Sequence, residues 1–118
     1  MDNICQDTLL PMIKVETFGE KIRTLREQNE MPLRKLAALL DLDQSTLSKI
    51  ERGERKANAD MIERLAKIFK VNKKELQVSF VSDQVAYNLL EEEFGKEILE
   101  VAEQKITYFK KIRKSAHV

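Results

Sequence analysis

The stretch from residue 32 to residue 56, PLRKLAALLDLDQSTLSKIERGERK, decides the fold. Pro32 suits the first position of a helix, where its missing N–H would have no partner in any case. This helix should end at Asp41, and Asp43 should cap the next helix, its carboxylate accepting from the N–H groups two and three residues on. Gly53 ends that second helix. Two short helices so close together must turn a sharp corner, which is the helix-turn-helix arrangement.

The two helices differ in the faces that they bury. The expected buried face of the first consists of Leu33, Leu36, Ala37 and Leu40. The second has only Leu47 and Ile50 as apolar residues, so most of it should be exposed. Its outward positions hold Gln44, Ser45, Thr46, Ser48, Lys49 and Arg52.

These outward side chains can all donate or accept hydrogen bonds, and none of them is acidic. Ser and Thr are poor interior helix formers, so an ordinary solvated helix face would use Glu and Lys instead. In the DNA major groove, an amide reads adenine, Lys and Arg read guanine, and Thr contacts the thymine methyl group. The second helix is therefore expected to contact bases, and Arg55 and Lys56 directly after it to contact phosphates.

The flanking residues predict three more helices of a bundle. Apolar residues recur at helical spacing over residues 17–29. Asn58 is expected to cap a fourth helix, and Asn72 a short fifth helix that contains Leu76. Residues 1–16 lack helical periodicity and are interpreted as a short extended arm.

The chain changes character at residue 78. Residues 78–81 have the composition of a strand, and Ser82 then suits the cap of a helix that reaches residue 94. Gly95 is expected to separate this helix from a longer one. The longer helix carries an apolar stripe of Ile98, Val101, Ala102, Ile106 and Phe109. We therefore expect an arm at 1–16, a DNA-binding domain at 17–77, and a C-terminal segment at 78–118 that supplies a dimer interface and a basic tail.

Length and composition exclude several classes of protein. A chain of 118 residues has room for about one domain with a small appendage. The net charge of +1 decides nothing about nucleic acid, although residues 14–77 carry four more bases than acids. Cys5 is the only cysteine and His117 the only histidine, so we expect no metal site, no cofactor and no enzyme activity. No apolar run approaches the ~18 residues of a membrane span, and a cytoplasmic protein is expected.

Residues 17–77 resemble the lambda-repressor/Cro (XRE-type) DNA-binding family. The run LSKIERG at 47–53, within QSTLSKIERGERKAN at 44–58, carries most of the resemblance. It implies an all-α protein whose first part is a five-helix bundle, followed here by a two-helix extension. It also implies that Gln44 is the first exposed residue of the recognition helix, and that Glu51 forms an internal ion pair with Arg26.

Two positions depart from the family's pattern. Leu33 stands where members usually have a Gln that contacts phosphate, so Arg34, Lys35 or the N-terminus of their helix must hold the DNA backbone instead. Asp41 stands where members usually have Gly in the turn. Because Asp tolerates left-handed backbone better than most residues, we expect the turn to be kept.

The leading hypothesis is a sequence-specific, DNA-binding transcriptional regulator that acts as a homodimer on two half-sites, its dimer interface supplied by residues 82–112. Small members of the family include controllers of restriction–modification genes and of phage lysogeny. A second hypothesis is an antitoxin-type protein whose C-terminal helices bind a partner protein while the helix-turn-helix represses its own operon. A third is a protein-binding helical domain that has lost DNA binding, against which the unacidic helix face argues.

Overall fold

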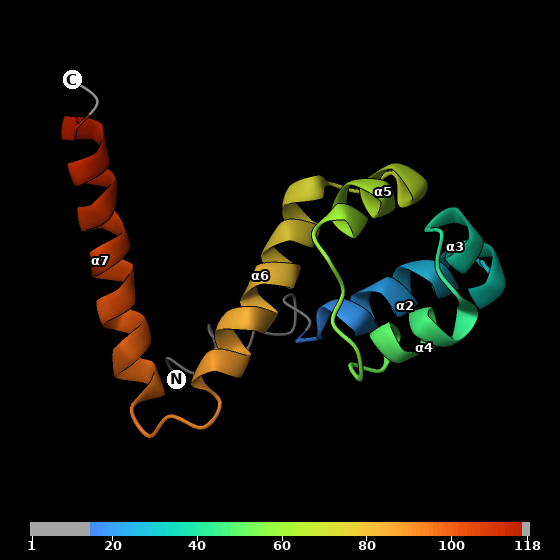
Figure 1. Ribbon diagram of the computed structural model, residues 1–118, viewed down its shortest axis with the longest axis horizontal. Coiled ribbons are helices and arrows are strands. Elements are labelled where there is room, and N and C mark those ends of the chain that lie inside the picture. The colour runs from blue at the N-terminus through green and yellow to red at the C-terminus, as the bar shows by residue number, and fades with distance from the viewer. Residues whose placement is uncertain (1–14, 117–118) are drawn as a thin grey trace, which may run out of the picture. The chain divides into compact units, whose positions relative to one another are not determined.

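The computed structural model of the chain describes residues 15–116 (Figure 1). The expected arm, Cys5 and His117 lie outside the described residues, apart from the last two positions of the arm. Within residues 15–116 all regular structure is helical, which confirms the expected all-α class. Contacts divide the chain into two units, Met1–Asp83 and Gln84–Val118, and each is described by itself.

The first three helices of the first unit are α2 (Phe18–Gln28), α3 (Leu33–Leu39) and α4 (Gln44–Glu51). A capping box starts α2: the Thr17 hydroxyl accepts from the Glu20 N–H at 3.0 Å, and the Glu20 carboxylate accepts from the Thr17 N–H at 2.9 Å. The three helices occupy the expected ranges to within two residues at either end.

The turn between α3 and α4 keeps its shape without glycine. Asp41 takes a left-handed φ of 58°, as expected for this position. The Leu42 N–H donates to the Ala37 carbonyl at 2.8 Å, which closes the end of α3. Gly53, with φ of 79°, ends α4 in the same left-handed conformation.

Asparagine side chains stand at the start of the next two helices, α5 (Asp60–Phe69) and α6 (Lys73–Leu89). The Asn58 side chain accepts from the Met61 N–H at 3.2 Å, although the regular helix begins two residues after Asn58. The Asn72 side chain accepts from the Lys74 N–H at 2.8 Å. Both residues therefore satisfy N–H groups that the helix itself leaves unpaired.

The strand expected at residues 78–81 and the helix start expected at Ser82 are both wrong. These residues lie inside α6, whose 17 residues contain neither Gly nor Pro to interrupt them. The rings of Phe80 and Phe18 meet edge to face at 5.3 Å between centroids, so tertiary packing favours the helix over the local strand propensity. The Ser82 hydroxyl donates to the Ser79 carbonyl one turn back and caps nothing.

The connection to α7 (Gly95–Ala116) also differs from the expectation. α6 ends at Leu89, not at residue 94, and Gly95 is the first residue of α7 and not a separator. Three consecutive glutamates at 91–93 follow the end of α6. Negative charge near a helix C-terminus is unfavourable, so these residues do not favour a continuation of α6. No helix of residues 15–116 is long and apolar enough to cross a membrane.

The core of the first unit combines side chains from α2 to α6. Its buried members are Phe18, Ile22, Leu36, Ala37, Leu40, Leu47, Ile50, Met61, Ile62, Leu65, Phe69 and Leu76. Gly19 lets α2 approach α4 closely, because a Cβ at this position would lie against the backbone carbonyl of Ile50 and 2.9 Å from that of Glu51. The core thus holds α4 in place by its inner side and leaves its outer side uncovered.

Candidate nucleic-acid interface

The orientation of α4 follows from what it buries. It packs against α2 and α3, and Leu47, Ile50 and Glu51 are its buried residues (Figure 1). Successive residues of a helix are rotated by about 100°, so these three residues take up one side of the helix. The other side faces away from the core.

Four of the six expected base-contacting residues are exposed: three lie together on this outer side, and Gln44 is exposed as the first residue of α4. Gln44, Ser45, Lys49 and Arg52 are exposed. The other two, Thr46 and Ser48, are half-buried. Thr46 lies next to Ile50 around the helix, at the margin of the buried side.

Arg52 has an ion-pair partner that the sequence analysis did not predict. Its Nε donates to the Glu54 carboxylate at 2.9 Å, and both side chains remain about half exposed. An exposed pair of this kind contributes about 0–1 kcal/mol, so it holds Arg52 only weakly. On contact with DNA, Arg52 would exchange its partner Glu54 for a base or a phosphate, at a small cost in free energy.

Asp43 stands at the start of α4 as expected, but its predicted capping bond is absent. Its backbone has the extended conformation of a helix cap, with φ of −69° and ψ of 148°, yet its side chain accepts no hydrogen bond from the helix. The carboxylate is exposed, and hydration competes with the capping bond. The prediction that Asp43 caps α4 through its carboxylate is therefore wrong.

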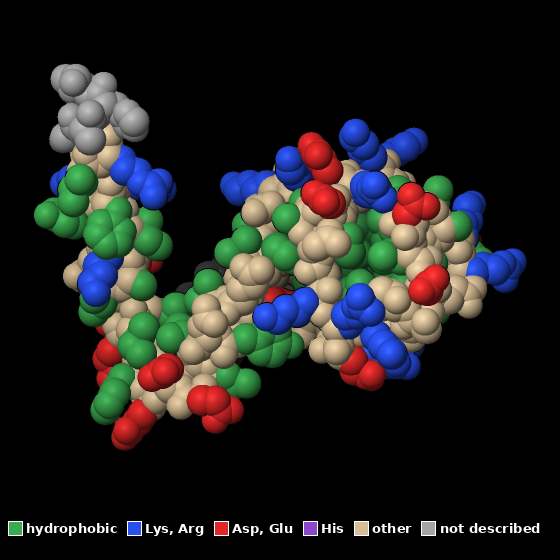
Figure 2. Space-filling view, viewed as in Figure 1, with side chains coloured by type: hydrophobic (Ala, Val, Ile, Leu, Met, Phe, Trp, Pro, Cys, Tyr) green, Lys and Arg blue, Asp and Glu red, His purple; other side chains and the backbone are tan. Residues whose placement is uncertain are grey.

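The residues expected to contact phosphate are exposed. Arg34 and Lys35 lie in the first turn of α3, and Arg55 and Lys56 follow α4. Leu33 is half-buried against the core. It therefore makes an apolar contact at the position where family members usually have a Gln that contacts phosphate. Figure 2 shows several Lys and Arg side chains over the α2–α5 part of the chain.

Arg26 and Glu51, the pair implied by the family resemblance, are joined by two hydrogen bonds. Nε and Nη2 of Arg26 donate to the two carboxylate oxygens of Glu51 at 2.9 and 3.0 Å. Nη1 donates to the Met31 carbonyl at 3.1 Å. The hydrogen bond from Glu51 raises the pKa of Arg26 above its usual value. The pair ties the end of α4 to α2 and to the loop after α2.

Two further polar contacts support this scaffold and were not predicted. The Asp83 carboxylate on α6 accepts from the N–H of Phe18, the first residue of α2, at 2.9 Å. Arg64 on α5 donates to the Leu40 carbonyl at the end of α3, at 3.2 Å. Neither contact has a local signal in the sequence, because 65 and 24 residues separate the partners.

Comparison with known proteins identifies the family. A helix-turn-helix family profile matches residues 22–76. Control protein C.BamHI of Bacillus amyloliquefaciens is 40% identical over 60 residues, which are 50% of this chain and 74% of the relative. The chain belongs to the XRE-type helix-turn-helix family. No solved structure gives a significant match.

Membership of the XRE-type family assigns a role to α4. α3 and α4 are the helix-turn-helix, and α4 is the recognition helix that enters the major groove in this arrangement. The chain is a DNA-binding transcriptional regulator. The match ends at residue 76, so it covers neither most of α6 nor any of α7.

Proposed function

We propose that this regulator is sequence-specific and reads bases with the exposed residues of α4. The observation that carries the proposal is their composition: Gln44, Ser45, Lys49 and Arg52 are exposed, and none is acidic. An amide and two cations provide the groups that recognise adenine and guanine edges. Arg34, Lys35, Arg55 and Lys56 would position the protein by contacting phosphates.

The regulator acts as a homodimer on an operator with two half-sites. α4 has eight residues and is therefore about 12 Å long, which limits one copy to a few base pairs. Two copies related by a two-fold axis read two half-sites about 34–36 Å apart and so gain both affinity and specificity. The similarity to a control protein supports a role in controlling restriction–modification genes. The alternative role is that of a phage-type repressor.

A second candidate is an antitoxin-type protein that binds a different protein through its C-terminal helices. The observation in its favour is the exposed apolar surface of α7, on which Val101, Ile106 and Phe109 are each about half exposed (Figure 2). Exposed apolar surface of this kind marks interaction sites, but it does not distinguish a second copy from another protein. Sedimentation of the whole chain and of a chain that ends at Leu89 distinguishes the two candidates, because only an α7-mediated homodimer is lost with α7.

Selection of bound sites from a random DNA pool, by the whole chain and at a stated salt concentration, tests the proposed function. We expect enrichment of two inverted half-sites whose centres lie about one helical turn apart. A pool that shows no enrichment after repeated rounds, while DNA still binds, would contradict sequence-specific recognition. A single enriched half-site would retain base recognition but contradict the homodimer.

A further inference from the structure

One side of α7 has the spacing of a helix that packs along another helix. Ile98, Ala102, Lys105, Phe109 and Ile112 follow one another at alternating intervals of four and three residues. This spacing is the heptad repeat of a coiled coil, and we call these five residues the α7 seam. Ile98, Phe109 and Ile112 of the seam are 37%, 53% and 46% exposed, so their apolar surface is not covered within the chain.

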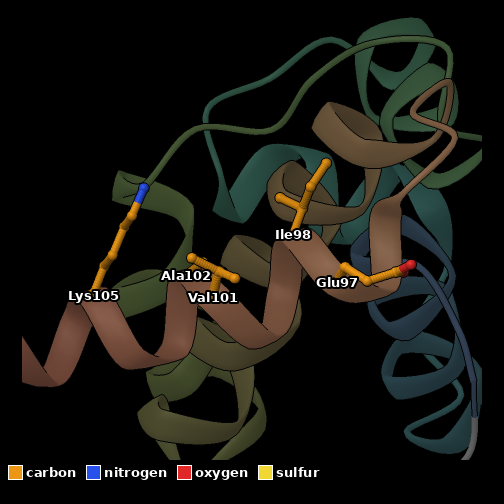
Figure 3. A pocket seen from close by; sticks show the side chains of 5 residues that line it. All are labelled: Glu97, Ile98, Val101, Ala102 and Lys105. Atoms are coloured by element: carbon orange, nitrogen blue, oxygen red, sulfur yellow. The ribbon is translucent and has the colours of Figure 1, made fainter.

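A shallow, open groove lies along the seam. Its lining consists of Glu97, Ile98, Val101, Ala102 and Lys105, all on α7 (Figure 3). Four of these residues stand at positions i, i+3, i+4 and i+7, which are the four corners of the hole that receives one side chain in knobs-into-holes packing. Ala102 contributes only a small side chain to the edge of this hole.

We propose that the hole receives Ile112 of a second copy of this chain, in an antiparallel pairing of the two α7 helices. The inference rests on the proposed homodimer and adds its interface, orientation and register. In this register the two-fold axis passes near Thr107, and Ala102 of each copy lies opposite Ile112 of the other. About 28 Å of the two helices overlap.

The distribution of charge along α7 favours the antiparallel orientation weakly. Its first ten residues contain three acids and one base, whereas residues 105–114 contain five bases and no acid. Antiparallel pairing sets the acidic half of each helix beside the basic half of the other. Glu100, Glu103, Lys111 and Lys114 lie on the side of α7 away from the seam, so their attraction acts beyond the ~8 Å screening length at physiological salt and is weak.

The seam residues favour the same orientation. In a parallel pair in register, Ala102 would meet Ala102 and leave the hole empty, and Lys105 would meet Lys105. In the antiparallel register, Lys105 lies opposite Phe109 of the second copy. An ammonium group over an aromatic ring is a favourable arrangement, and the Lys stem covers apolar surface while its charge reaches water.

Disulfide cross-linking of the full-length chain tests the orientation. In a Cys5→Ser background, which removes the only native cysteine, two chains are made, one with Ala102→Cys and one with Ile112→Cys. The proposed pairing places position 102 of one copy opposite position 112 of the other. In each chain alone, the two equivalent positions are about 15 Å apart along the helix, beyond the ~7 Å Cα separation that a disulfide spans. Mild oxidation should link the mixture and neither chain alone.

The alternative results separate this inference from the proposed function. Cross-linking of each chain alone would show a parallel pair and overturn the inference, while the homodimer would stand. A dimer by sedimentation that never cross-links would place the interface elsewhere and overturn it too. A chain that stays monomeric while it binds its two-half-site operator would overturn both.

Discussion

Gly19 shows how one residue sets the distance between two helices. A Cβ at this position would meet backbone atoms of Ile50 and Glu51, which cannot rotate away as a side chain can. We expect Gly19→Ala to lower the free energy of unfolding by about 3 kcal/mol, at the upper end of the range for overpacking. Chemical denaturation followed by circular dichroism measures the loss.

Gly95→Ala is the matched control for that prediction. Its nearest neighbouring atom is the Leu89 carbonyl oxygen at 3.8 Å from the added Cβ, which is an ordinary contact. The control should leave the stability unchanged or raise it by up to about 1 kcal/mol, because Ala restricts the unfolded chain. Equal effects of the two substitutions would contradict the close approach of α2 and α4.

The pair of Arg26 and Glu51 is the second residue-scale prediction. The Glu51 side chain is 5% exposed and that of Arg26 is 15% exposed, so each has little access to water. Glu51→Gln leaves the guanidinium charge without its partner and should cost about 3 kcal/mol. Glu54→Gln, which breaks the exposed pair with Arg52, should cost less than about 1 kcal/mol. Equal midpoints of thermal melting for the two variants would show that burial does not strengthen the pair.

For single residues, the sequence predicts the role of a residue better than the contacts that its side chain makes. The left-handed φ of Asp41 was foreseeable because Asp adopts this conformation more readily than most residues. Glu30 and Lys70 adopt it as well, with φ of 49° and 55°, and nothing in their chemistry indicates this. The absent capping bond of Asp43 depends on a side-chain rotamer and on hydration, which residue type alone does not determine.

At the scale of elements, α6 connects the bundle to the rest of the chain. The Asp83 carboxylate accepts from the Phe18 N–H, which is one of the donors that α2 cannot pair within itself. Asp83→Ala leaves this half-buried donor without its partner and should cost about 1–3 kcal/mol of unfolding free energy. Gln84→Ala, at the neighbouring exposed position, is the control and should change stability by less than about 0.5 kcal/mol. A loss of the same size in both variants would contradict the role of Asp83.

The limits of α6 were the part of the fold that the sequence predicted least well. Residues 78–81 read as a strand because Val and Phe favour strands locally, while the packing of Phe80 on Phe18 becomes known only in three dimensions. By contrast, α3 and α4 were predictable, since turn, spacing and apolar pattern all agree within 25 residues. The outer side of α4 could be read for the same reason.

At the scale of the whole molecule, the two units have different roles in our proposal. The first unit carries the recognition helix, and we propose that α7 holds two copies together. A chain that ends at Leu89 keeps Phe80 and Asp83, and should therefore melt close to the temperature of the whole chain. Sedimentation should find it monomeric at concentrations where the whole chain is a dimer. Equally tight dimers of both chains would exclude α7 from the interface.

Base recognition by α4 is tested by the affinities of Gln44→Ala for the selected operator and for random DNA. Gln28→Ala, an exposed glutamine on α2, is the control. We expect Gln44→Ala to lose about 1–3 kcal/mol on the selected operator and almost nothing on random DNA, because only the operator offers the matching base edge. Gln28→Ala should bind both like the unaltered chain. Equal losses of Gln44→Ala on both DNAs, or no loss on either, would contradict base recognition by α4 through Gln44.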